Sequence, residues 1–459
     1  MTSRIAFRWP SAGHALLQLL WVVVTALAVL PAQAASPAPA PSPAATVPES
    51  HKSLGVGTCA SSLCHGSIEP WKDSPVLQNE YITWSRQDKH ARAYSVLLNA
   101  RSREIMKKLG SKRPAHETKL CLDCHAHNPP AAERGENFQV SDGVSCEACH
   151  GASQGWIKTH VEPNATHARN VAHGLIATDQ DLTRARMCLS CHLGTQQKFV
   201  THKIMAAGHP RMSFELDTFT QIEPPHYRID DDWQKRKGSS NGVRSWAMGQ
   251  AVAAQELLAL LQSPTGRDGL FPELSLFDCH SCHHEMSDKR NTAARVGAGP
   301  GVVRLNDAGL LMLRQIVRRI EPQQAAEFSQ QVGLLHEQVA SGTNALAQAG
   351  QVESMIAAMV PKIAAHPFSN RDLQAILIGL IDDGLAGQYT DYQGAEQAVM
   401  AMQSVADFMD RLQLLSAQSI RQPMQKLLAA VARDEQYDPT VFKKYLGQLR
   451  AKVQPEKKS

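Results

Sequence analysis

The chain has 459 residues, of which 47 are Lys or Arg and 43 are Asp or Glu, so its formal net charge is only +4. Because no run of basic residues is interleaved with aromatic ones, the composition gives no support for nucleic-acid binding. Ten clustered cysteines in a chain of this length also do not fit the disulfide framework that stabilises small secreted domains.

The first 50 residues predict export rather than a folded domain. Arg4 and Arg8 precede an apolar run that ends in Pro-Ala-Gln-Ala at residues 31–34. This pattern is typical of a secretory signal peptide, so we expect residues 1–34 to be cleaved. An uncleaved signal would instead anchor the protein in the membrane. Residues 35–50 are rich in Pro and Ala and predict an extended, disordered spacer.

The ten cysteines form five pairs within residues 51–295. Four of the pairs read C-x-x-C-H, and they are Cys121 with Cys124, Cys146 with Cys149, Cys188 with Cys191, and Cys279 with Cys282. The first pair, Cys59 and Cys64, lies in CASSLCHG and is separated by four residues. A histidine directly follows each pair, and these are His65, His125, His150, His192 and His283. Haem c is attached by thioethers to two such cysteines, and the histidine binds its iron. The sequence therefore predicts five covalent haem c groups.

Other uses of paired cysteines explain this pattern less well. Structural zinc needs four ligands, so five pairs cannot be divided evenly, and zinc does not require a histidine directly after the second cysteine. Redox-active C-x-x-C motifs usually occur once, at the start of a helix. Covalent haem attachment follows export, so five haems and a signal peptide together predict a periplasmic protein.

Residues 51–295 are too few to enclose each of five haems in a domain of its own. We therefore predict a mainly α fold in this region, with short helices and long loops around haems that pack against one another.

Residues 300–455 have no cysteine and show helical periodicity, which predicts a C-terminal helical bundle. Ser369 and Asp372 resemble a capping box at the start of one helix. The apolar positions with helical spacing are Leu310, Leu313, Val317 and Ile320; Leu373, Ile376, Leu377, Leu380 and Ile381; Phe408, Leu412 and Leu415; and Leu427, Leu428 and Val431. Methionines in this region (Met355, Met359, Met400, Met402, Met409) fit core packing better than iron ligation. We expect the bundle to be separable from the redox chemistry.

Fourteen histidines remain when the five motif histidines and His14 are set aside. A second histidine on an iron favours electron transfer, whereas an open position allows small-molecule chemistry. We expect His90 to lie on a helix that starts near Ser85. His160 follows His150 by ten residues, His202 and His209 flank a helical turn, and His226 lies in Pro-Pro-His-Tyr. The reserve candidates are His116, His127, His167, His173, His280 and His284, while His336 and His366 fit structural roles in the bundle.

The segments GVSCEACHG, AGHPR, FELDTF and CHSCHHEM resemble a family of multihaem cytochromes c, over roughly residues 54–290. This is the cytochrome c-554 family, the tetrahaem type that accepts electrons from hydroxylamine oxidoreductase, with the wider group that includes that octahaem enzyme. The resemblance implies tightly packed haems with bis-histidine ligation, and it implies that His90, His160, His202, His209 and His226 are the distal ligands. The chain departs from the family in having five sites rather than four or eight, and in the long Cys59–Cys64 spacing. None of its motifs ends in the lysine that marks the active haem of pentahaem nitrite reductase.

These observations favour a periplasmic protein that transfers electrons along five haems between redox partners, such as another cytochrome or a quinol-linked membrane complex. The alternative is an oxidoreductase that acts on a small nitrogen or sulfur compound at one five-coordinate haem. His226, Arg211 or Arg228 would then lie near the open iron as proton donors or anion ligands. A third possibility, compatible with the first, is a subunit whose bundle docks to a membrane complex.

Overall fold

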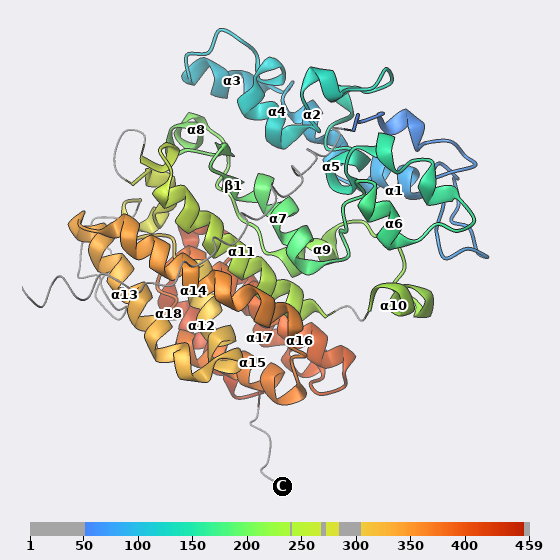
Figure 1. Cartoon of the computed structure of the whole chain (residues 1–459). Helices are drawn as coiled ribbons and strands as arrows, with labels where there is room; N and C mark the ends of the chain where they lie inside the picture. Colours follow the sequence, from blue (N-terminus) through green and yellow to red (C-terminus); the bar gives the residue numbers. More distant parts are fainter. Residues whose placement is uncertain (1–50, 239–240, 268–271, 284–303, 454–459) are drawn as a thin grey trace, which may run out of the picture. The chain divides into compact units, whose positions relative to one another are not determined.

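The structure, a computed structural model, describes residues 51–238, 241–267, 272–283 and 304–453 (Figure 1). It is mainly helical, as predicted. The sheet found in the described residues has two short antiparallel strands, β1 (Gly194–Thr195) and β2 (Lys198–Phe199). The predicted signal peptide and spacer lie outside these residues. Within the described ranges, no helix is both long and apolar enough to cross a membrane.

Short helices joined by loops make up residues 51–237. They are α1 (Glu80–Gln87), α2 (Ala93–Val96), α3 (Ala100–Lys108), α4 (Lys119–His125), α5 (Cys146–His150), α6 (His167–Ala172), α7 (Asp181–His192), α8 (His202–Ala207), α9 (Leu216–Ile222) and α10 (Asp231–Lys237). Up to residue 180 the clustered apolar core consists of three buried side chains, Leu97, Met106 and Ala115, with a few partly buried neighbours. Helices this short depend on tertiary contacts for their stability. The clustered apolar core of this part of the chain is therefore small.

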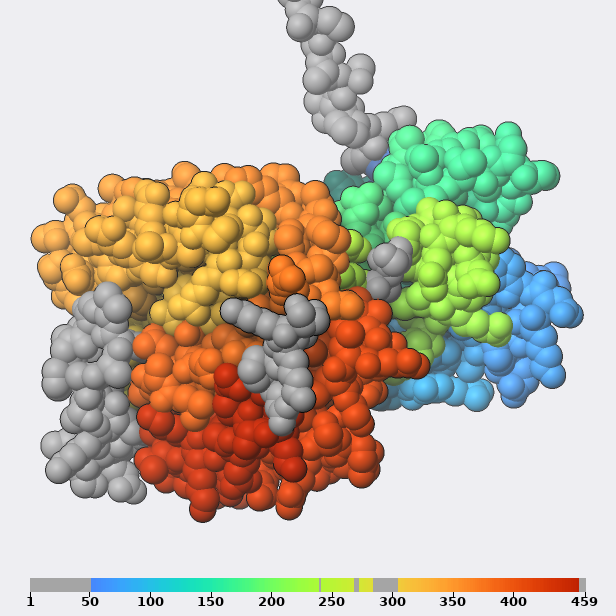
Figure 2. Space-filling model, turned by 90° about the horizontal axis from the view of Figure 1, so that it is seen from below, coloured from blue at the N-terminus to red at the C-terminus, as the bar shows by residue number. Residues whose placement is uncertain are grey.

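Long helices pack side by side in the rest of the chain. They are α11 (Gly242–Gln262), α12 (Ala308–Ile320), α13 (Ala325–Ser341), α14 (Ala345–Ala365), α15 (Asn370–Leu385), α16 (Tyr392–Arg411), α17 (Ala417–Ala430) and α18 (Pro439–Arg450). Figure 2 shows the residues of α12 to α18 as one contiguous body, coloured from yellow to red. Helix α11 is buried on nearly all sides and contacts α7, α9, α12, α14 and α16. Most of its residues are apolar, as expected for a helix at such a central position.

The helical periodicity of the bundle is confirmed in most positions. All five predicted apolar residues of α15 are fully buried, and Ser369 and Asp372 form the predicted capping box. Met359, Met402 and Met409 are buried among apolar side chains. The predicted continuation of α16 is wrong, because that helix ends at Arg411 and both Leu412 and Leu415 lie beyond it. Leu428 lies on α17 as predicted and is 43% exposed.

One apolar core extends from Ala185 of α7 to Val453. Helix α11, which lies within the range 51–295 that the sequence assigns to the haem region, forms the centre of this core. The bundle is therefore not confined to residues 300–455. The bundle packs against α7, the helix that carries the fourth cysteine pair, through α11.

Candidate functional site

Local structure places each motif histidine near the end of a short element. Helices α4, α5 and α7 end at His125, His150 and His192, one residue after the second cysteine of each motif. The first motif instead follows a 3-10 turn that ends at Thr58, and the fifth begins with a 3-10 turn at Cys279. No disulfide joins the ten cysteines, all of which are described.

Each motif histidine faces the imidazole of a second histidine. The centroids of the two rings are 6.3 Å apart for His65 and His160, 6.0 Å for His192 and His90, 6.3 Å for His125 and His209, 6.3 Å for His150 and His226, and 6.2 Å for His283 and His202. The five partners are the five histidines that the resemblance to the multihaem family implies as distal ligands. The structure also gives their pairing, which the sequence left open.

The distance between the rings fits one metal ion between them. An imidazole nitrogen binds a metal at about 2 Å, and its ring centroid lies roughly 1 Å further back, so two rings on opposite sides of a metal have centroids about 6 to 6.5 Å apart. All five pairs fall in or at the edge of this range, although they join residues far apart in the sequence. With two cysteines beside one member of each pair, the residues present fit a covalently attached haem.

Five of these ten histidines form hydrogen bonds through Nδ1, which leaves Nε2 free to bind a metal. Ring atom Nδ1 lies 2.9 Å from Glu80 Oε2 in His65 and 3.0 Å from Asp88 Oδ1 in His90. In His125, His160 and His209, Nδ1 lies 2.7 to 3.1 Å from a backbone carbonyl. An oxygen without a hydrogen can only accept, so Nδ1 donates and the lone pair resides on Nε2. Ligand histidines are typically oriented in this way.

Most of the reserve histidines use the opposite nitrogen. Nε2 lies 2.8 Å from Ser53 Oγ in His127, 3.0 Å from Asp179 in His167, and close to Asp434 in His280. The same nitrogen contacts Asp307 in His336 and Asp372 in His366, as expected for structural histidines of the bundle. In His116 it is 3.8 Å from Glu117. His284 lies outside the described residues.

Burial keeps two of the motif histidines neutral. It lowers the pKa of His150 and of His192 to about 4, so both imidazoles hold a free lone pair at neutral pH. The His192 ring also stacks on Phe214 at a centroid distance of 4.5 Å, and Phe219 packs beside it. These contacts fix the orientation of the ring.

Two acidic residues that the sequence gave no reason to select hold histidines of the site. Glu80, at the start of α1, contacts His65, and the buried Asp88 contacts both the side chain and the backbone N–H of His90. Helix α1 ends at Gln87, so the predicted helix from Ser85 through His90 is wrong, and His90 begins a 3-10 turn instead. Hydrogen bonding to Asp88 raises the pKa of His90, and bonding to Glu80 raises that of His65.

Replacing Glu80 by glutamine is expected to raise the reduction potential of the haem held by His65 and His160. The carboxylate makes the His65 imidazole more electron-rich and so favours ferric iron, whereas a neutral amide does so less. Redox titration followed by visible absorption measures the shift. Glu69→Gln, at an exposed carboxylate, serves as the control and should leave every potential in place. Equal titration curves for Glu80→Gln and the unmodified protein would contradict this role.

Glu147, between the cysteines of the third motif, ties the first motif to the third. Its buried carboxylate accepts hydrogen bonds of 2.8 Å from the backbone N–H groups of Leu54, Gly55 and Ser153. Backbone donors that are buried without an acceptor are costly, and a charged acceptor strengthens each bond. Glu147 therefore holds the segment before Cys59 against α5.

Replacing Glu147 by alanine is expected to lower the free energy of unfolding by about 3 kcal/mol, because it leaves several buried N–H groups without an acceptor. Thermal unfolding monitored by far-UV circular dichroism checks this. The exposed Glu136 provides a matched control, since Glu136→Ala removes a carboxylate from the surface. A Glu147→Ala protein as stable as this control would rule out the proposed contribution.

The cysteines of different motifs lie close together in a definite order. A side-chain hydrogen bond with Cys146 raises the pKa of Cys59, and one with Cys191 raises the pKa of Cys124. Burial chiefly, and then the nearby Cys188, raise the pKa of Cys149. Lys198 joins the last two sites, because its Nζ lies 3.1 Å from Cys191 Sγ and 2.8 Å from the carbonyl of Asp123. The first four motifs are thus neighbours in the order first, third, fourth, second.

The fifth motif adjoins the second through α8. His202 begins this helix and faces His283, and its backbone N–H donates to Glu273, shortly before the fifth motif. Gly208 adopts a φ of +124°, which is accessible to glycine, and ends the helix so that His209 turns towards His125. One short helix therefore supplies the partners of two motifs.

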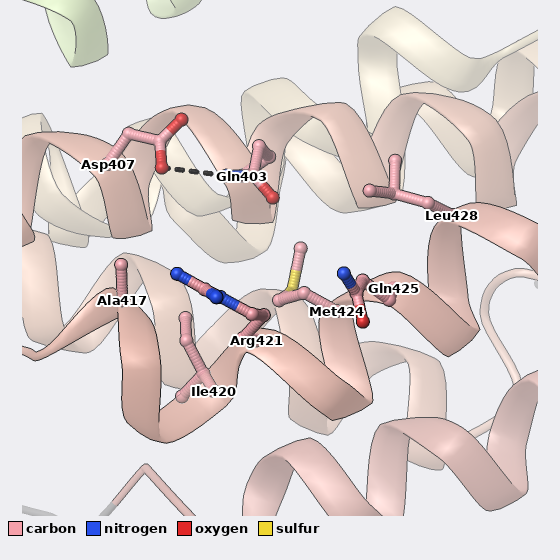
Figure 3. Close-up of a pocket in the computed structure, with 8 residues that line it drawn as sticks. All are labelled: Gln403, Asp407, Ala417, Ile420, Arg421, Met424, Gln425 and Leu428. Carbon is pink, nitrogen blue, oxygen red and sulfur yellow. Dashed lines mark hydrogen bonds between the residues drawn. The ribbon is translucent and has the colours of Figure 1, made fainter.

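A small pocket lies elsewhere, between α16 and α17 (Figure 3). Its lining includes Arg421, Met424 and the hydrogen-bonded pair of Gln403 and Asp407. None of the paired histidines or cysteines lines it, so it is not part of the site.

A mainly helical chain with repeated cysteine pairs and opposed imidazoles has the features of a multihaem c-type cytochrome. Residues 58–151 match the family described as cytochrome c554 and c-prime. This match confirms the resemblance for that segment and supports a c-type cytochrome of electron transfer with covalently bound haem c. Comparisons with curated proteins and with solved structures found no match.

Proposed function

We propose that this protein is a pentahaem electron-transfer cytochrome in which every iron has two histidine ligands. The observation that carries the proposal is that each of the five motif histidines faces one histidine of its own at 6.0 to 6.3 Å. Bound haem iron supplies reversible one-electron chemistry, and its potential depends on the axial ligands and their hydrogen bonds.

The chain fixes where the haems attach and in what order they lie. Contacts between cysteines support the spatial order of motifs first, third, fourth, second, and α8 places the fifth beside the second. This order differs from the order in the sequence. The first and fifth motifs are at the two ends of this spatial order, which makes their haems candidates for electron exchange with partners. Any interior haem site that reaches the surface is a candidate as well.

The alternative function, an oxidoreductase, requires one motif histidine without a second histidine opposite it, because a substrate needs an open position on the iron. In the described residues each motif histidine has its partner, and His226, which the alternative would use as a proton donor, faces His150. The geometry thus favours the relay over an enzyme for a nitrogen or sulfur compound.

Location and partners follow from the same proposal. A signal peptide over residues 1–34 and attachment of haem after export support a periplasmic protein. Suitable partners are another cytochrome or a quinol-linked membrane complex.

Intact-mass measurement and electron paramagnetic resonance test the proposal together. The mature protein should carry five haems, and the oxidised form should be wholly low-spin. The planes of the paired rings are within 28° of parallel in the first and fifth pairs and 78° to 87° apart in the other three. Because ring orientation sets the anisotropy of low-spin iron, we expect two rhombic and three highly axial signals. Four haems, or a high-spin haem in the unmodified protein, would refute the proposal.

A further inference from the structure

Positive charge is concentrated around the second motif. Residues 86–119 contain ten Lys and Arg but three acidic residues, a net charge of +7, whereas the whole chain has +4. The basic residues are Arg86, Lys89, Arg92, Arg101, Arg103, Lys107, Lys108, Lys112, Arg113 and Lys119. The remainder of the chain is therefore net negative, and the protein has a strongly uneven charge distribution. We call residues 86–125 the basic lobe.

The fold exposes all ten of these side chains. The basic lobe has the small core of its own described above, in which Leu97, Met106 and Ala115 pack with Cys121 and Leu122. Among the described residues, one of these ten basic side chains forms an ion pair, which joins Lys119 to Asp123. Of the acidic residues in the segment, Asp88 is buried against His90 and does not offset the surface charge. The positive field of the basic lobe is consequently directed outwards.

The charges surround a haem attachment site. Cys121, Cys124 and His125 lie on α4, and Lys119 is the first residue of that helix. Helix α4 packs against α2 and against the 3-10 turn that follows α3, and that turn also contacts α3, so α4 belongs to the same lobe as the basic residues (Figure 1). Val96, Leu98 and Leu120 are 44 to 47% exposed among the charges. An apolar centre with a charged rim is the usual composition of a protein interface.

We propose that the basic lobe is the docking surface for an acidic redox protein, which exchanges electrons with the haem held by Cys121 and Cys124. In each encounter the partner gives up one electron and the haem iron takes up one, with no bond made or broken. Long-range attraction between unlike charges accelerates such encounters by about 10-fold to 10³-fold at low salt. This inference rests on the proposed electron-transfer function and adds the entry point and the partner's charge.

Stopped-flow reduction of the full haem-loaded protein by flavodoxin hydroquinone, an acidic one-electron donor, tests the proposal. The variant is Lys107→Glu/Lys108→Glu/Lys112→Glu, and its matched control is Lys443→Glu/Lys444→Glu/Lys452→Glu, at three exposed lysines of the bundle. The lobe variant should react about tenfold or more slowly than the control at low salt. The difference should shrink at high salt, where charges are screened. Lys→Gln at the same three lobe positions should give a smaller loss and avoids placing acids at the end of α3.

Each remaining result has a distinct meaning. Equal rates for the lobe variant and the control would overturn the docking proposal, because only total charge would then matter. The proposal would also be overturned if the lobe variant lost binding to phosphatidylglycerol vesicles while its rate of reduction by flavodoxin stayed unchanged. That result would identify a lipid surface as the occupant. Failure of the proposed function has a different signature, a high-spin haem in the unmodified protein. Dithionite should still reduce all five haems in every variant, so a slower flavodoxin rate reports docking alone.

Discussion

Replacing His226 by alanine is expected to convert one haem in five from low-spin to high-spin. His226 faces His150 at 6.3 Å, and no other histidine among the described residues forms a ring contact with His150. Without its imidazole, the iron bound to His150 would keep one protein ligand and take water or an added small molecule in the sixth position. Electron paramagnetic resonance of the oxidised protein should show a new high-spin signal, and cyanide should bind rapidly to that one haem.

His167→Ala is the matched control. His167 is a reserve candidate of the sequence, and its Nε2 lies 3.0 Å from Asp179 rather than towards a motif histidine. This variant should remain wholly low-spin and slow to bind cyanide. If His167→Ala instead produced the high-spin signal and His226→Ala did not, the pairing in the structure would be incorrect.

Ending the chain at residue 303 is expected to abolish folding, in contrast to the prediction from sequence that the bundle is separable. Truncation removes α12, α14 and α16, which pack against α11, and so exposes apolar side chains of that helix. Each such side chain contributes about 1.5 to 3 kcal/mol when buried. Several of them together approach or exceed the total stability of a typical domain, about 5 to 15 kcal/mol.

The bundle also holds parts of the site directly. Arg211, two residues after His209, donates to both carboxylate oxygens of Glu396 on α16 at 2.9 and 3.0 Å and stacks over Tyr392. Gln393 contacts Cys279 Sγ at 3.8 Å. We expect the truncated chain to be recovered as aggregated or degraded protein, as measured by haem staining of the soluble fraction. A soluble chain with five low-spin haems would show that the boundary lies near residue 300 after all.

The sequence pattern alone was most successful for features that depend on residues adjacent in sequence. The family match supports covalent haem in the segment with the first three cysteine pairs, and the helices of the bundle begin and repeat largely as periodicity indicated. The errors fall at helix ends. Leu412 and Leu415 continue an apolar pattern but lie beyond the end of α16, which spacing does not reveal.

The sequence also contains the basic residues of the lobe, but composition alone hides them. The net charge of +4 is the sum over a strongly positive segment and an acidic remainder. That these side chains share one exposed lobe around α4 depends on how α2, α3 and α4 pack. Glu80, Asp88 and Glu147 were likewise unremarkable in the sequence, because a carboxylate gains its role only from the donor that the fold brings to it.

By itself, the sequence predicts the haem attachment sites and the proximal histidines, since covalent attachment requires two cysteines and a histidine within a few consecutive residues. It also determined the helical bundle, because periodicity is a local property. Tertiary structure alone decided that His90 faces His192 and that one helix supplies partners to both His125 and His283. Two imidazoles can share a metal only if their nitrogens come within about 4 Å of each other. For residues so distant along the chain, that proximity is a consequence of packing, and the spacing of residues in the sequence does not predict it.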